Sequence, residues 1–127
     1  MFALVADVDS YQHFLPWCSR SIVHERDEHA MRASLDVAKG PFSKRLTTVN
    51  HLTPDDSIEI ELVDGPFKSL GGRWVFESRA DNGCVVSLHL SFEFASRIVG
   101  ATFGKVFNEI AATMVSAFCR RAHEVYG

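Results

Sequence analysis

The chain has 127 residues, of which 46% are hydrophobic and 23% are charged, and its formal net charge is -3 at pH 7. This composition is typical of a folded globular domain and excludes disorder, collagen and a coiled coil as descriptions of the whole chain. No apolar run approaches the ~20 residues that cross a bilayer. The acidic balance disfavours DNA as a partner, while a local basic patch stays open. The length predicts a single domain over residues 1–127.

Cysteine usage and the N-terminus bear on the compartment. The three cysteines Cys18, Cys84 and Cys119 are widely spaced, odd in number and free of any CxxC pattern. This favours buried thiols in a reducing compartment over a disulfide framework. The apolar start is short, lacks basic residues and runs at once into Asp7 and Asp9, unlike a secretory signal. We predict a cytoplasmic protein and leave contact with the inner face of the membrane open.

The first residues have helical spacing. Residues 1–8 place four apolar side chains on one helical face, namely Met1, Leu4, Val5 and Val8. The pair at 9–10 either ends this helix or caps a second short helix over 11–14. Pro16 then ends that second helix, because the residue before a proline avoids the helical region.

A run of about six antiparallel strands is predicted next, because apolar and polar residues alternate. The predicted strands cover 20–25, 31–37, 44–52, 58–62, 71–76 and 86–94. Breaks separate them at 40–41, at 53–56, at 64–66 and at a hairpin turn over 80–83 with an Asn-Gly pair.

One long amphipathic helix is predicted over 97–126. This stretch has no proline, Ser96 is a good N-cap, and apolar residues recur every three or four positions. The apolar stripe consists of Phe103, Phe107, Ile110, Met114, Phe118, Ala122 and Val125. Strands followed by a helix indicate an α+β fold, with the helix on one face of a curved antiparallel sheet.

Several ordered motifs carry a family resemblance through nearly the whole chain. They are Asp9-Ser10-Tyr11, Phe14-Leu15-Pro16-Trp17-Cys18, Gly65-Pro66-Phe67, Leu70-x-Gly72-x-Trp74-x-Phe76, Phe92-Glu93-Phe94, Ala117-Phe118 to Arg121-Ala122, and Val125-Tyr126-Gly127. Together they resemble the START-like family of coenzyme Q-binding proteins and the ribosome association toxin RatA, grouped with polyketide cyclase-like proteins. The resemblance implies a helix-grip fold, in which a curved antiparallel sheet wraps around the C-terminal helix and encloses an apolar cavity.

The chain departs from that family in two places. Gln12 stands where the family usually has proline after the tyrosine. The family's first strand is also missing, and it would pair beside the strand at 86–94. Its absence would expose an apolar edge, which favours aggregation. We therefore expect the natural chain to begin upstream of Met1.

Catalytic and metal-binding patterns are not found. The six histidines form no HxH, HxxxH or HExxH pattern, and neither a GxSxG elbow nor a phosphate loop occurs. Cys18 has no base placed by sequence, so a buried apolar role is expected. We predict no cofactor, no metal and no catalytic residue. The apolar character of the inward positions argues against a cyclase or dehydratase.

The aromatic residues are interpreted mainly as core, with some lining the cavity that the resemblance implies. Predicted ligand-binding residues are Trp74, Phe76, Phe92, Phe107, Ile110 and Met114, and the cavity mouth is assigned to Phe67 and Lys68. Gly100 and Gly104 lie inside the helix, where glycine is unfavourable. Either the cavity or close helix-on-sheet contact would explain them.

The leading functional prediction is non-catalytic binding of a hydrophobic small molecule. By resemblance, this molecule is ubiquinone or a related isoprenoid quinone, and the role is support of respiratory electron transport. The alternative, also by resemblance, is a RatA-like toxin that binds the large ribosomal subunit and blocks subunit association. The sequence motifs are shared by both, so they do not separate the two functions.

Overall fold

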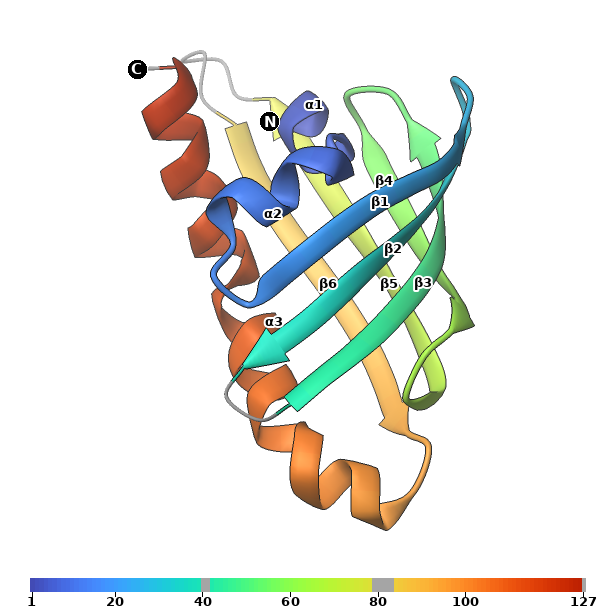
Figure 1. Cartoon of the computed structure of the whole chain (residues 1–127). Helices are drawn as coiled ribbons and strands as arrows, with labels where there is room; N and C mark the ends of the chain where they lie inside the picture. Colours follow the sequence, from blue (N-terminus) through green and yellow to red (C-terminus); the bar gives the residue numbers. More distant parts are fainter. Residues whose placement is uncertain (40–41, 79–83, 127) are drawn as a thin grey trace.

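The computed structural model describes residues 1–39, 42–78 and 84–126 (Figure 1). Three short helical segments open the chain: α1 (Phe2–Ala6), a 3-10 turn (Val8–Ser10) and α2 (Tyr11–Phe14). The strands are β1 (Cys18–Arg26), β2 (Ala30–Lys39), β3 (Phe42–Thr53), β4 (Ser57–Asp64), β5 (Phe67–Ser78) and β6 (Cys84–Phe94). The last element is the helix α3 (Arg97–Tyr126).

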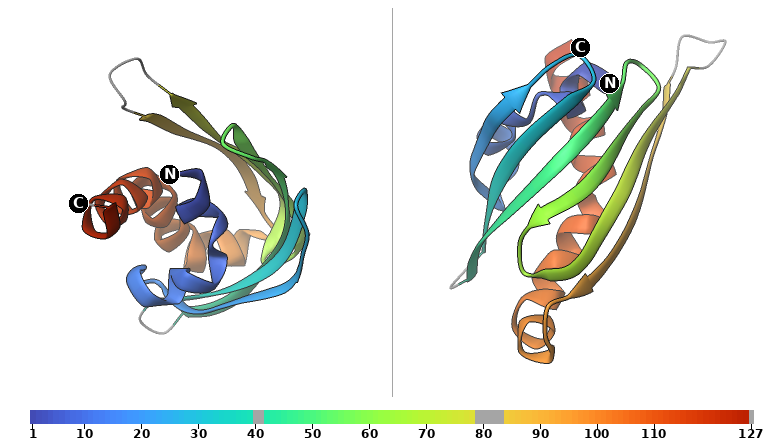
Figure 2. Two further views of the ribbon diagram at one scale, coloured as in Figure 1. Left: turned by 90° about the horizontal axis from the view of Figure 1, so that it is seen from above. Right: turned by 90° about the vertical axis from the view of Figure 1, so that its right-hand side faces the viewer.

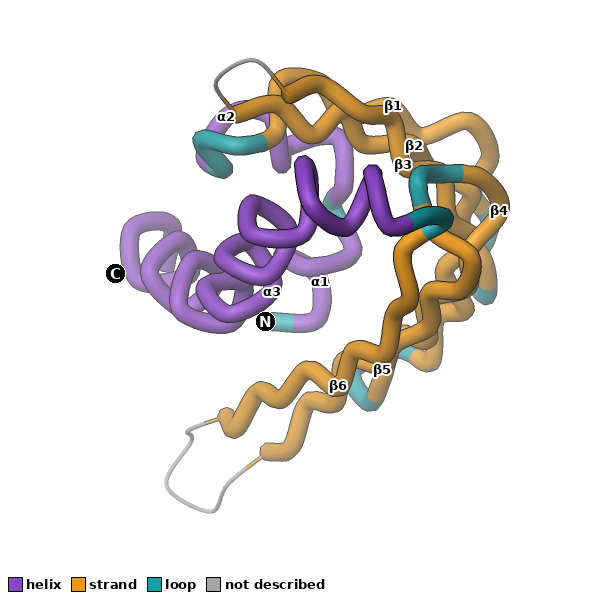
Figure 3. Tube along the Cα trace, turned by 90° about the horizontal axis from the view of Figure 1, so that it is seen from below, coloured by secondary structure: helices purple, strands orange, loops and turns teal. Residues whose placement is uncertain are grey.

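The described strands form one antiparallel sheet in chain order, β1-β2-β3-β4-β5-β6. Viewed along the helix, the sheet curls around α3, and the N-terminal helices close one side of the grip (Figure 2). This confirms the predicted α+β helix-grip architecture. The view from below shows the same wrap, with β5 and β6 extending away from the helix (Figure 3).

The interior contains two clusters of buried side chains on the concave side of the sheet. One joins the N-terminal helices to the C-terminal half of α3, with Val5, Tyr11, Leu15 and Phe118 at its centre. The other lies against the N-terminal half of α3 and contains Phe67, Phe103, Phe107 and Ile110. The helix is therefore held at both ends by different parts of the chain.

The long helix begins and ends where the sequence predicts. The backbone N–H of Val99 donates to Oγ of Ser96 at 3.2 Å, so Ser96 is a true N-cap. Among the described residues, no helix is both long and apolar enough to cross a membrane.

The start of β5 differs from the prediction. The strand begins at Phe67 and not at Gly71, and a register shift lies between Phe67 and Ser69. Pairing of Phe67 with Phe94 extends the ladder past the predicted break, and Pro66 accepts a hydrogen bond from the N–H of Ala95 at 3.1 Å. The predicted break at 40–41 and the hairpin turn at 80–83 lie outside the described residues.

The strand β6 lies at one edge of the sheet. Within the described residues it pairs with β5 on one side, from Phe67 opposite Phe94 to Ser78 opposite Cys84. The expectation of an upstream strand beside β6 stays a prediction.

Candidate ligand-binding cavity

A cavity of about 90 Å³ lies between α3 and the concave face of the sheet. Its walls come from strands β2 to β6, from α3 and from the N-terminal helical segment. Strand residues in the wall include Leu35, Ile60 and Leu88, and almost all of the lining is apolar. Within the described residues, no side chain that lines the cavity carries a charge.

Four of the predicted ligand-binding residues line this cavity. Trp74 comes from β5, where it pairs with Ile58 and Leu88 on the inner face. Phe107, Ile110 and Met114 come from α3. Their spacing of three and four residues places them on one helical face, toward the sheet. The structure thus brings a tryptophan from the sheet and three apolar side chains from the helix to one space.

The other two, Phe76 and Phe92, are not among the residues that line the cavity. Phe76 is buried against Trp74, with parallel rings whose centroids are 6.2 Å apart. Phe92 packs edge-on against Phe107 at 4.8 Å and against Phe67 at 6.1 Å. Both rings support a lining residue from behind. Any role of all six residues in ligand binding stays a prediction.

The two residues assigned to the cavity mouth lie on β5, and their assignment to a mouth stays a prediction. Phe67 is buried in the second core cluster and stacks on Phe94 at 5.4 Å, so it fills space between sheet and helix. Lys68 is exposed, and its Nζ lies 3.9 Å from Oε1 of Glu93. Neither residue lines the cavity. Neighbouring side chains on a strand point to opposite faces of the sheet, which is why Phe67 is buried and Lys68 is exposed.

Two polar side chains that the sequence analysis missed stand in the cavity wall. Thr48 and Asn50 both line it from β3, and the hydroxyl of Thr48 donates to Oδ1 of Asn50 at 3.0 Å. Asn50 is 9% exposed. A signal was available, because Leu46 and Leu52 share their parity on the strand and both are buried.

Tyr11 brings a third polar group to the wall, but its hydroxyl is already committed. That hydroxyl donates to the carbonyl oxygen of Val5. Burial, and secondarily the charge of Asp7, raises the pKa of Tyr11 well above its ordinary range. The phenol therefore stays neutral and ties α1 to α2 beside the cavity.

The cysteines differ in their surroundings. Cys18 is buried, and desolvation raises the pKa of its thiol to about 11, so it is protonated at neutral pH and a poor nucleophile. This agrees with the apolar role expected for Cys18. Cys119 is exposed on α3, so the expectation of buried thiols is wrong there, because it lies on the outward helix face. The side chain of Cys84 lies outside the described residues.

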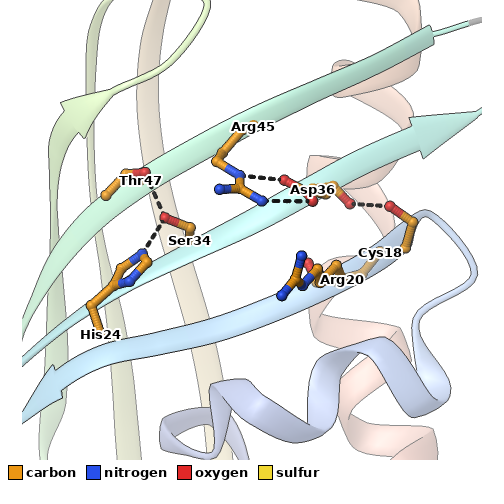
Figure 4. A network of polar contacts seen from close by, with 8 residues as sticks. Cys18, Arg20, His24, Ser34, Asp36, Arg45 and Thr47 are labelled. Atoms are coloured by element: carbon orange, nitrogen blue, oxygen red, sulfur yellow. Dashed lines mark hydrogen bonds and ion pairs between the residues drawn. The ribbon is translucent and has the colours of Figure 1, made fainter.

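The main polar network lies on the opposite, convex face of the sheet (Figure 4). His24 Nε2 is 2.7 Å from Oγ of Ser34, which is 2.6 Å from Oγ1 of Thr47. Beside them, Arg45 binds both carboxylate oxygens of Asp36, at 2.7 and 3.1 Å. None of these five residues lines the cavity, so the network ties β1, β2 and β3 together from outside.

The helix glycines are explained by close packing. A Cβ atom at Gly100 or Gly104 would lie 3.5 or 3.4 Å from the ring of Phe94. Neither glycine lines the cavity. Of the two explanations that the sequence left open, contact between helix and sheet is the one the structure supports.

Among the described residues, no group of three or more histidine, cysteine or acidic side chains is placed to hold a metal.

Residues 1–119 match the family described as polyketide cyclase / dehydrase and lipid transport. The chain belongs to this family. It is 53% identical over 127 residues to "Ribosome association toxin RatA" of Vibrio cholerae, an alignment that spans all of this chain and 88% of that protein.

More distant similarity extends to a coenzyme Q-binding relative and to a solved structure. The chain is 32% identical over 131 residues to "Coenzyme Q-binding protein COQ10 homolog B, mitochondrial" of Xenopus laevis, covering all of this chain but 54% of that protein. A START superfamily structure from Mycobacterium smegmatis superposes with a TM-score of 0.78 at 18% identity, over 98% of this chain and 88% of that one. The resemblance to the START-like family is thereby confirmed.

Proposed function

We propose that this protein acts on ribosomes, as a RatA-type factor that binds the large ribosomal subunit and blocks subunit association. One observation carries the proposal: 53% identity to "Ribosome association toxin RatA" of Vibrio cholerae, without a break in coverage of this chain. Identity to the coenzyme Q-binding relative is 32%. This difference in identity supports placing the ribosomal role first and lipid binding, the leading prediction from the sequence, second.

Co-sedimentation tests this function. The purified protein is centrifuged through a sucrose cushion with ribosomes at about 50 mM and about 200 mM salt, because contacts to RNA phosphates weaken with salt. We expect the protein in the ribosomal pellet, and gradient profiles in which free subunits increase at the expense of intact ribosomes. An unrelated acidic protein of similar mass measures carry-over. Protein that stays in the supernatant at both salt concentrations contradicts the proposal.

A second function, binding of an apolar molecule, is favoured by the cavity between α3 and the sheet. The lining is almost wholly apolar and uncharged within the described residues, as such ligands require. At about 90 Å³ the cavity is smaller than the ~150 Å³ that accommodates benzene in an engineered core. A ubiquinone or another isoprenoid quinone would therefore enter only if α3 moved away from the sheet.

An organic extract of the purified protein, analysed by mass spectrometry, tests the second function. A stoichiometric apolar molecule supports it and identifies the ligand class.

The two functions are separable, because Asn50 faces the cavity and Asn50→Leu should leave ribosome binding at the wild-type level. We propose that neither function involves catalysis and that both are exercised in the cytoplasm.

A further inference from the structure

The side-chain amide of Asn50 is the feature of the cavity that packing does not explain. Its neighbours across the ladder on either side are Met31 and Ile60, whose side chains carry no nitrogen or oxygen acceptor. The Oδ1 atom accepts from Thr48, but Nδ2 has no hydrogen-bond partner among the described residues. Among the described residues, no completely buried side-chain nitrogen or oxygen lacks a hydrogen-bond partner, so Nδ2 is not sealed off, and it belongs to a residue that lines the cavity.

A second donor lies in the same wall. Trp74 is 2% exposed and lines the cavity from β5, and its indole N–H has no hydrogen-bond partner among the described residues. Indole nitrogen is a donor only. The polar hydrogens that remain without a partner in the wall are therefore those of the Asn50 amide and the Trp74 indole, because Tyr11 and Thr48 already donate their hydroxyl protons.

We propose that Asn50 is a specificity-determining residue that donates a hydrogen bond to an uncharged acceptor, such as a carbonyl oxygen, on an otherwise apolar ligand. This inference rests on the second proposed function. An anionic ligand, such as a fatty acid carboxylate, is disfavoured because no cationic side chain lines the cavity within the described residues. A buried carboxylate would then lose its hydration without a counter-charge.

Thr48 acts as a positioning residue for this contact. Its hydroxyl donates to Oδ1 of Asn50, and an amide whose oxygen is held in this way directs its NH2 group away from Thr48. Thr48→Val keeps the shape of the side chain and removes that hydrogen bond. The substitution should weaken the preference for a carbonyl ligand, while Asn50→Leu should abolish it.

The test uses two probes of similar shape, acetophenone and ethylbenzene, of which the first alone carries a carbonyl group. Both are larger than benzene, so, as for a quinone, their entry requires α3 to move away from the sheet. Each is titrated into the full chain, and amide chemical shifts in NMR spectra give the dissociation constant. In wild-type protein we expect acetophenone to bind about fivefold more tightly than ethylbenzene, which is the value of one net hydrogen bond. In Asn50→Leu we expect this preference to disappear. Asn108→Ala, on the exposed side of α3, is the matched control and should behave as wild type.

The outcomes separate the two levels of the proposal. Equal affinity for both probes, unchanged in Asn50→Leu and Thr48→Val, overturns the role of Asn50 but leaves apolar binding in the cavity standing. Failure of wild-type protein to bind either probe overturns both. If Asn50→Leu does not fold, the comparison between wild type and the isosteric Thr48→Val decides the matter, since a carbonyl preference that is equal in these two contradicts the proposal.

Discussion

At the scale of single residues, the ion pair between Asp36 and Arg45 connects β2 to β3 on the convex face. Arg45 donates from Nε to Oδ1 and from Nη2 to Oδ2. These hydrogen bonds hold the pKa of the Asp36 carboxyl below its ordinary value of 3.8. A paired and bidentate geometry of this kind is stronger than a single surface contact.

The pair predicts a pH-dependent contribution to stability. Because the pKa of Asp36 is lower in the folded state, its contribution is fully present above 3.8 and is lost as the pH falls through the folded-state pKa. Arg45→Met should therefore lower the melting temperature at pH 7. At a pH well below 3.8 the difference from wild type should shrink. A melting-temperature difference that is the same at both pH values contradicts this prediction.

Asn50 shows what residue-level patterns can and cannot reveal. Its parity with Leu46 and Leu52 was enough to place it on the inner face of the predicted strand. Its amide nitrogen has no nitrogen or oxygen acceptor beside it, because the residues that pair with Asn50 across the ladder are Met31 and Ile60. These partners are 19 and 10 residues away in sequence, counting from 50 to 31 and to 60, so only the strand register could show it.

At the scale of elements, strand β5 lines the cavity and also contains two adjacent glycines. Gly71 and Gly72 are adjacent on this strand and face opposite sides. A Cβ atom at Gly72 would lie 2.8 Å from Leu90 and 2.9 Å from the backbone oxygen of His89, whereas at Gly71 the nearest atom is 3.9 Å away. The strand therefore tolerates a side chain at one position and not at the other.

Gly72→Ala should destabilise the fold by about 1–3 kcal/mol, the usual cost of forcing an extra methyl group into a packed site. The backbone oxygen of His89 is the obstacle, and it belongs to the β5–β6 ladder, which cannot move without losing its pairing. Gly71→Ala is the matched control and should leave the free energy of unfolding unchanged or slightly increased. Urea denaturation measures both, and equal effects would contradict the steric explanation.

Local sequence signals predicted the boundaries of α3 correctly but misplaced the start of β5. The helix α3 starts and ends as predicted, because its N-cap and its periodicity are local signals. The start of β5 was misplaced, because Gly65-Pro66 suggested a longer break than the chain makes. The pairing of Phe67 with Phe94 extends that strand, and such a partner is not visible from the sequence of β5 alone.

At the scale of the whole molecule, Phe118 links the two ends of the chain to the sheet. It is 0% exposed. Its ring packs edge-on against Tyr11 at 5.0 Å, Phe14 at 5.4 Å and Trp74 at 5.4 Å. A side chain of α3 thus contacts both the N-terminal helical segment and β5, which closes the grip around the helix.

Phe118→Ala should cost about 3–5 kcal/mol, because it removes a buried ring and leaves a cavity between three elements. This is a large fraction of the ~5–15 kcal/mol that stabilises a typical domain. Phe118→Leu should lose less, since it fills part of the same space. Ile98→Ala is the control, because Ile98 is 75% exposed on the same helix. A Phe118→Ala variant as stable in urea as Ile98→Ala would contradict this account of the core.

Local patterns in the sequence predicted the α+β class, the long C-terminal helix and the alternation of apolar and polar residues along the strands, because residue periodicity and capping are local properties of the chain. It also carried the motifs of the family. Which inward side chains border the cavity depends on how the sheet packs against α3. Phe76 and Phe92 pack behind it, while Tyr11, Trp17 and Asn50 enter its wall. The cavity exists where the curved sheet and α3 fail to close completely, and that mismatch arises from contacts between residues far apart in sequence.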